Sequence, residues 1–177
     1  VIFSDFRHGM FNKSSIPMLE EAIPEGAMRI ADSQVSTRWG NITEFQNFDL
    51  VTPNEREARF ALADQDSTIG VLAANVRNAT KSANVILKLG GRGVFCIGDP
   101  GYQSVDSFAD RVVDPVGAGD ALLAYATLTM LTSGSIFEAS ILGSFAAGCE
   151  CQLDGNIPIK SEHVHEKIDM VESLTKY

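Results

Sequence analysis

A glycine-rich loop at residues 114–120, with the sequence Asp-Pro-Val-Gly-Ala-Gly-Asp, leads directly into an apolar stretch of helical character. Gly117, Ala118 and Gly119 lack bulk, so their backbone N–H groups can come close to a ligand. The helix that follows leaves its first amides without intrahelical acceptors and presents the positive end of its dipole. These features predict a binding site for an anion such as a phosphoryl group.

Asp120 lies in the first turn of that predicted helix. One interpretation is structural, because a carboxylate there caps the helix or interacts with its dipole. The other is chemical: Asp120 accepts the proton of a substrate hydroxyl while that hydroxyl attacks a phosphoryl group in the anion site. The helix dipole weakens a carboxylate as a base, but a loose phosphoryl-transfer transition state needs positioning more than strong basicity. Both interpretations stay open on this residue alone.

The elements that must position these residues follow from the apolar runs, which alternate between short β-type stretches and longer helical ones. This alternation predicts an α/β protein in which helices cover a parallel sheet. We expect strands at residues 1–6, 28–31, 49–52, 85–89, 94–97 and 103–108. We expect helices at residues 16–22, 54–62, 68–80, 119–132, 136–152 and 162–174. No repeat or linker divides the chain, so we predict a single domain over residues 1–177.

The composition excludes several classes of protein. The chain has 177 residues, of which 45% are hydrophobic, and a formal charge of −9, which argues against a nucleic-acid partner. No apolar run approaches the roughly twenty residues of a membrane span and no leader is evident, so we expect a cytoplasmic protein. Cys96, Cys149 and Cys151 are interpreted as buried thiols. The chain opens at Val1 inside a predicted strand, and we expect it to be the back half of a longer protein.

Three motifs stand in the order found in the ribokinase-like, or PfkB, family of carbohydrate kinases. Residues 114–120 match its D-[TP]-x-G-A-G-D signature, residues 52–58 resemble T-P-N-x-x-E-A, and residues 88–93 resemble the [TK]-x-G-x-x-G nucleotide turn. Residues 4–9 are similar to the S-D-Y-x-K-G stretch of heptose-phosphate-kinase-like members, with His8 in place of the lysine. The resemblance implies a ribokinase-like three-layer α/β/α fold with a mainly parallel sheet, lacking the N-terminal part and the lid.

The resemblance also implies roles for particular residues. Asp120 becomes the catalytic base, and the amides of residues 117–119 become the anion hole for the γ-phosphoryl group of ATP. Asn54 and Glu57 match the N-x-x-E positions that organise Mg²⁺ and its waters near the nucleotide phosphates. Their spacing is also close to that of a helix capping box, and both roles can hold at once.

The nucleotide turn and the end of the chain supply further candidates. By resemblance, the Lys88 ammonium meets nucleotide phosphates, and Gly90 and Gly93 let the backbone pass close to the nucleotide. A tight β-hairpin requires glycines in any case. Asp114 and the carbonyl of Val116 match positions that bind a monovalent cation such as K⁺, with further carbonyls from a loop at residues 153–156. The alternative for Asp114 is a turn residue before proline.

Asp5 and Asp32 fall at the ends of predicted strands, where open α/β sheets bind their ligands. We assign Asp5 to the substrate site and leave Asp32 without a role.

The first hypothesis for function is therefore an ATP- and Mg²⁺-dependent kinase that phosphorylates a hydroxyl of a sugar or sugar phosphate. The second is a truncated nucleotide-binding or regulatory module without catalysis of its own. In either case a second copy, or an N-terminal half, is expected to cover the open edge of the sheet.

Overall fold

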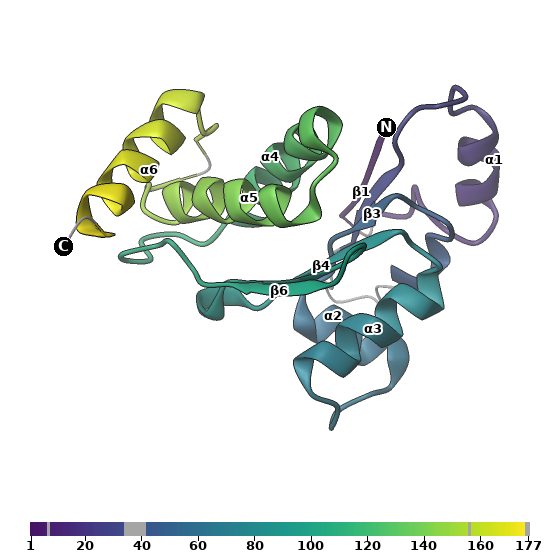
Figure 1. The fold of residues 1–177 in the computed structure, drawn as a ribbon. Coiled ribbons are helices and arrows are strands. Elements are labelled where there is room, and N and C mark those ends of the chain that lie inside the picture. The colour runs from purple at the N-terminus through teal and green to yellow at the C-terminus, as the bar shows by residue number, and fades with distance from the viewer. Residues whose placement is uncertain (7, 34–41, 156, 176–177) are drawn as a thin grey trace. The chain divides into compact units, whose positions relative to one another are not determined.

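The computed structural model describes residues 1–6, 8–33, 42–155 and 157–175 (Figure 1). They form two compact units. The first unit comprises Val1–Leu89 with Phe95–Gln103, and the second comprises Gly90–Val94 with Ser104–Tyr177. None of the helices in the described ranges is long and apolar enough to cross a membrane.

The strands form one six-stranded sheet in which spatial order follows chain order, from β1 to β6. They are β1 (Ile2–Asp5), β2 (Ile30–Ser33), β3 (Leu50–Val51), β4 (Asn84–Lys88), β5 (Val94–Ile97) and β6 (Tyr102–Val105). Strands β1 to β4 run parallel, with Ile2 opposite Ile30, and Val51 opposite both Ala31 and Val85. The short connections before and after β5 leave no room for a parallel crossover, so this end of the sheet is antiparallel.

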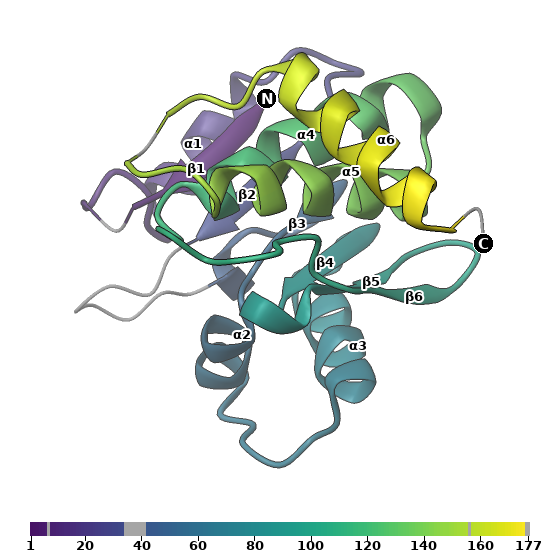
Figure 2. The same cartoon turned by 90° about the vertical axis from the view of Figure 1, so that its left-hand side faces the viewer.

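The first unit adds helices α1 (Ser15–Glu21), α2 (Glu55–Leu62) and α3 (Ile69–Thr80), and a 3₁₀ turn at Ile42–Glu44. Helices α2 and α3 pack against β4 from one side of the sheet, as both views show (Figures 1 and 2). The core of this unit is mostly aliphatic and contains an aromatic cluster, in which Phe3 stacks on Phe11 at 5.2 Å and meets Phe48 edge-on at 5.4 Å.

The second unit contains α4 (Ala118–Ser133), α5 (Ile136–Glu150) and α6 (Ser161–Thr175), with α5 packed against both other helices (Figure 2). A sharp turn joins α4 to α5: Gly134 is left-handed, and the Ser135 side chain caps α5 by accepting the Glu138 N–H. Beneath the helices, Phe108 and Phe145 stack with ring centroids 3.8 Å apart.

The predicted elements are confirmed, with differences in two strands, one turn and one thiol. Strand β6 ends at Val105, three residues earlier than expected. Strand β2 begins and ends two residues later than expected, so it includes Asp32 and Ser33, whose polarity had suggested the end of the strand. Residues 88–93 do not form a tight hairpin turn, because Gly90–Arg92 make a 3₁₀ helix. The thiols of Cys96 and Cys149 are buried as predicted, whereas Cys151 is only half-buried.

Gly93 is required by the chain's own backbone. Its φ is +84°, and a Cβ there would lie 2.1 Å from the carbonyl oxygen of Val105. Gly90 is also left-handed, with φ +62°, but a Cβ at Gly90 meets nothing within 4 Å. The two glycines of the turn therefore differ in what an added methyl group would cost.

We predict that Gly93→Ala lowers the free energy of unfolding by clearly more than Gly90→Ala. The Gly90 variant carries only the left-handed backbone penalty of about 1–2 kcal/mol. The Gly93 variant adds a clash with backbone atoms that cannot move aside. Urea unfolding of both variants measures the difference, and equal losses would contradict it.

Candidate active site

Polar side chains gather where the parallel strands of the first unit end. Asp5 is the last residue of β1 and lies opposite Ser33, the last residue of β2, while Thr52 directly follows β3. Lys88 ends β4. Because parallel strands bring their carboxyl ends to one edge, four separate segments meet here, as in open α/β sheets that bind ligands.

Asp32 is the centre of this edge, although sequence analysis assigned it no role. Its side chain is 1% exposed. Its Oδ1 accepts a hydrogen bond from Thr52 Oγ1 at 2.8 Å and forms an ion pair with Lys88 Nζ at 2.7 Å. A buried carboxylate requires such partners, because its charge is costly to remove from water. The signal that could have identified Asp32 is a lone acidic residue inside an apolar strand.

Asn54 and Glu57 form the capping box that their spacing predicted. Asn54 Oδ1 accepts the Glu57 N–H at 2.8 Å, and Glu57 Oε2 accepts the Asn54 N–H at 2.8 Å. A third bond runs from Asn54 Nδ2 to Glu57 Oε1 at 2.6 Å. Asn54 also pairs with Lys88 as an isolated parallel bridge. The capping role is thus observed, and it holds the carboxylate of Glu57, which is 2% exposed, next to the edge.

The second unit carries the glycine loop. Gly117 is the N-cap of α4 with φ +89°, and helical bonding starts with the Ala121 N–H donating to the Gly117 carbonyl at 2.9 Å. The Ala118 N–H donates to the Pro115 carbonyl in a longer bond of 3.3 Å. The Gly119 amide therefore precedes the first helical bond, as an anion-binding helix start requires. Asp120 stands in this first turn.

Asp114 adopts the turn geometry that was its alternative interpretation. Its Oδ1 accepts the Val116 N–H at 3.0 Å, and its own N–H donates to the Cys151 carbonyl at 3.3 Å. The glycine loop is thereby tied to the end of α5. Of the loop predicted to supply further carbonyls, residues 153–155 are exposed or half-buried, and Asn156 lies outside the described residues.

Glu150, at the end of α5, was not predicted to belong to the site. It is 2% exposed, and its Oε1 has no hydrogen-bond partner in the described part of the chain. Burial raises the pKa of the Glu150 carboxyl, and the nearby carboxylates of Asp114 and Asp120 raise it further. The sequence does not indicate that Glu150 lies near Asp114 and Asp120; this follows from the packing of α5 near the glycine loop.

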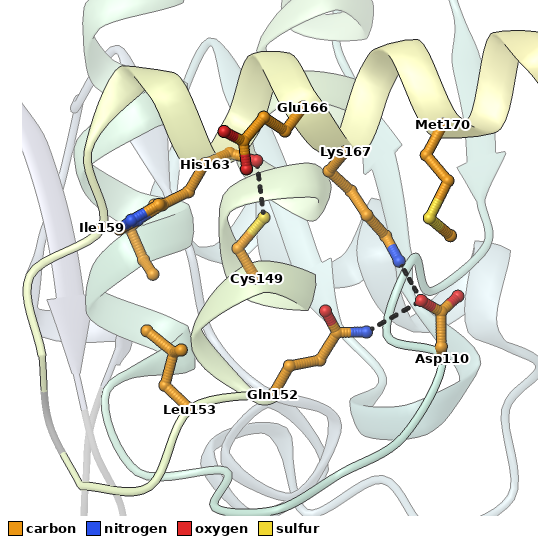
Figure 3. Close-up of a pocket in the computed structure, with 9 residues that line it drawn as sticks. All are labelled: Asp110, Cys149, Gln152, Leu153, Ile159, His163, Glu166, Lys167 and Met170. Atoms are coloured by element: carbon orange, nitrogen blue, oxygen red, sulfur yellow. Dashed lines mark hydrogen bonds and ion pairs between the residues drawn. The ribbon is translucent and has the colours of Figure 1, made fainter.

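A small cavity in the second unit includes Leu153 from the loop predicted to supply carbonyls, but neither Asp114, Val116 nor the glycine loop lines it (Figure 3). It has a volume of about 250 Å³ and lies against α5 and α6. Inside it, Lys167 Nζ pairs with Asp110 Oδ2, which also accepts Gln152 Nε2 at 3.0 Å. Burial raises the pKa of the Cys149 thiol at its wall, so this sulfur is a poor nucleophile. The cavity is lined by Asp110, Cys149, Gln152, Leu153, Ile159, His163, Glu166, Lys167 and Met170.

The first unit is thus an open, mainly parallel α/β sheet, and the second unit carries a glycine loop at the start of a helix. Residues 19–162 match the model of the pfkB family of carbohydrate kinases, and the chain belongs to this family. The predicted family and fold class are confirmed.

Individual relatives agree with this assignment. The chain is 21% identical over 179 residues to the bifunctional protein HldE of Methylobacillus flagellatus, covering 99% of this chain and 36% of that protein. It is 30% identical over 121 residues to the ribokinase of Haemophilus influenzae, covering 64% of this chain and 39% of that protein. Its fold is similar to that of a phosphofructokinase-2 mutant from Escherichia coli, with a TM-score of 0.80 at 18% identity, covering 97% of this chain and 56% of that one. The chain thus spans well under half the length of these two curated relatives.

We predict that Glu150→Gln stabilises the protein at neutral pH. A carboxyl group whose pKa is raised by folding stabilises the folded state below its unfolded pKa, and that contribution is lost as the pH rises through the folded value. At pH 8 the variant should therefore melt a few degrees above the wild type, and the gain should vanish as the pH falls toward the ordinary value of 4.5.

Glu162→Gln provides the matched control for this thermal unfolding series. Hydrogen bonds from its own backbone N–H and from the Ser161 hydroxyl lower the pKa of Glu162, so the sign reverses. Its replacement should cost a little stability at pH 8. A Glu150→Gln variant that is less stable than the wild type at pH 8 would contradict the prediction.

Proposed function

We propose that this protein is part of an ATP-dependent phosphotransferase that moves the γ-phosphate of ATP to a hydroxyl of a sugar or sugar phosphate. The observation that carries the proposal is the glycine loop at the start of α4 with Asp120 in its first turn, in a chain of the carbohydrate kinase family. We expect the protein to act in the cytoplasm, where ATP is available.

Asp120 is the general base of this proposal. Its carboxylate accepts the proton of the acceptor hydroxyl, whose oxygen bonds to the γ-phosphorus while the bond from that phosphorus to the β–γ bridging oxygen breaks and ADP leaves. The amides of Gly117 and Gly119 donate to the phosphoryl oxygens and stabilise the charge in transit. The Ala118 amide joins them by exchanging its 3.3 Å bond to the Pro115 carbonyl for the anion. Because Gly117 is left-handed, the chain can turn its amides toward an anion there without a side chain in the way.

The residues proposed to organise Mg²⁺ have suitable chemistry. Glu57 presents a buried carboxylate, held in one orientation by its hydrogen bonds with Asn54. Because both oxygens already accept hydrogen bonds, contact through metal-bound water suits this pair, and Mg²⁺ commonly retains several waters. When bound, the ion neutralises charge on the nucleotide phosphates.

A monovalent cation is proposed to bind beside the glycine loop. Asp114 and the Val116 carbonyl are its assigned ligands, with carbonyls from residues 153–156. The observed Asp114 turn leaves its Oδ2 for such a contact, since Oδ1 accepts the Val116 N–H. Asp5 is proposed to contact the substrate; it is 2% exposed at the end of β1.

The second candidate function is a nucleotide-binding or regulatory module without catalysis of its own. The chain spans 36% and 39% of the length of the two relatives compared. A second copy of the chain, or an additional N-terminal half, would then complete the enzyme.

We predict that the protein binds a non-hydrolysable ATP analogue in a Mg²⁺-dependent manner. Isothermal titration calorimetry with and without Mg²⁺ measures this directly. Binding that requires Mg²⁺ supports both candidate functions, and kinase activity toward sugars then separates them. Absence of binding at millimolar analogue would contradict both.

We predict that Asp120→Asn reduces phosphotransfer by at least about 100-fold, while the affinity for the ATP analogue changes little, because only proton acceptance is lost. Asp169→Asn, on α6, removes an exposed carboxylate of the same unit and should leave turnover unchanged. Comparable turnover in the Asp120 variant and the wild type would exclude Asp120 as the base.

A further inference from the structure

We propose that Asp32 is a positioning residue: it holds the Lys88 ammonium at the carboxyl edge of the sheet, where the remaining N–H groups of that ammonium bind phosphate oxygens of the nucleotide. The inference rests on the proposed function and deepens it. It gives a role to Asp32, the buried carboxylate of this edge to which the sequence analysis assigned no role.

Lys88 is fixed at both ends of its side chain. Its backbone N–H donates to the Pro53 carbonyl at 2.9 Å, and the residue pairs with Asn54 across the strand. Its ammonium lies 2.7 Å from Asp32 Oδ1. A lysine has a long, flexible stem, so without the second anchor the ammonium would sample many positions. With both anchors it occupies one.

The burial of the pair is unequal. The side chain of Asp32 is 1% exposed, whereas that of Lys88 is 15% exposed, so solvent reaches part of the lysine and almost none of the carboxylate. An ammonium has three N–H donors, and the Asp32 bond uses one. Up to two donors can therefore serve a ligand while the ion pair stays intact.

Stability alone does not account for this arrangement. A buried ion pair contributes little net stability compared with well-packed apolar residues. The same edge also holds the hydroxyl of Ser33, which is fully buried and has no hydrogen-bond partner within the described ranges. The Asn54–Glu57 pair, proposed to organise Mg²⁺, joins the edge through its bridge to Lys88. Because Asp5, Asp32 and Glu57 make this edge acidic, the Lys88 ammonium is the group of the edge that can meet a nucleotide phosphate directly.

Two roles of Asp32 predict opposite results. If Asp32 only competes with phosphate for the ammonium, its removal frees positive charge and tightens nucleotide binding. If Asp32 positions the ammonium, its removal weakens binding even though the edge becomes more positive. The sign of the change in affinity therefore separates positioning from competition.

The test is calorimetric titration of the ATP analogue with Mg²⁺ into the wild type, Asp32→Ala, Asp32→Asn, Lys88→Met and the Asp32→Ala/Lys88→Met double variant. We expect Asp32→Ala and Lys88→Met each to weaken binding roughly tenfold or more, as loss of a charge-assisted contact would. Asp32→Asn retains an acceptor for the ammonium and should recover part of the affinity. In the Lys88→Met background, Asp32→Ala should have no further effect.

Three results would overturn the inference: an Asp32→Ala variant that binds as tightly as the wild type or more tightly, losses that multiply in the double variant, or Lys88→Met with unchanged affinity. Arg77→Met is the matched control, since it removes another cation of the same unit. Arg77 pairs with Asp99 at 3.5 Å, and the Asp99 side chain is exposed. This variant should leave affinity unchanged.

Circular dichroism establishes that each variant is folded. If Asp32→Ala does not fold because Lys88 is left unpaired, Asp32→Asn decides: it removes the charge but keeps an acceptor for the ammonium, so positioning predicts weaker binding than in the wild type and competition predicts tighter binding. A wild type that binds no analogue refutes the proposed function and this inference together, whereas a wild type that binds, with Asp32→Ala unaffected, refutes the inference alone.

Discussion

The parallel pairing of β1 to β4 is the constraint on which the first unit depends. Parallel strands end on the same edge, so any polar residue at a strand end is brought beside the polar ends of its neighbours. Thr52 and Lys88 are far from Asp32 in the sequence, yet both donate a hydrogen bond to the same carboxylate oxygen of Asp32, Oδ1. On β1, Phe3 contacts Phe45 and Phe48, which belong to the segment leading into β3. The apolar core therefore packs against both strands beneath the same polar edge.

In the second unit, the loop before α4 is held by a left-handed glycine, by an Asp114 side chain that accepts the Val116 N–H, and by the Val113 and Asp114 amides, which donate to the Cys151 carbonyl at the end of α5. Glu150 lies next to this carbonyl in the chain. Its carboxyl is buried beside two other acidic residues, and the described part of the chain offers no hydrogen bond to one of its oxygens. Such local conflict is common where a chain is shaped for binding and not for stability alone.

The elements could be predicted well from the sequence because their signals are local. Asn54 and Glu57 mark the start of α2 through their spacing, and Gly134 marks the sharp end of α4. The glycine loop could likewise be recognised, since small residues before a helix have a direct physical meaning. The predicted roles of Lys88 and Asp5 remain predictions, although the strand ends that carry them were located closely.

What the sequence could not supply is contact between distant segments. Nothing local indicates that Asp32 would bind Lys88, since the two lie 56 residues apart. The end of β2 was misplaced for the same reason: Asp32 and Ser33 look like loop residues until the neighbouring strands provide their surroundings. The carboxyl group of Glu150 comes near Asp114 and Asp120 through the packing of α5, which no spacing in the sequence encodes.

The contact at Gly93 bears on how motifs of this kind are interpreted. Only glycine fits at position 93, because the backbone of residues 105–107 occupies the space that a side chain would need. A descendant of this chain that had lost every catalytic group would still require glycine there in order to fold. Presence of that glycine in a genome-derived sequence therefore indicates the architecture, and carries no information on whether the reaction survives.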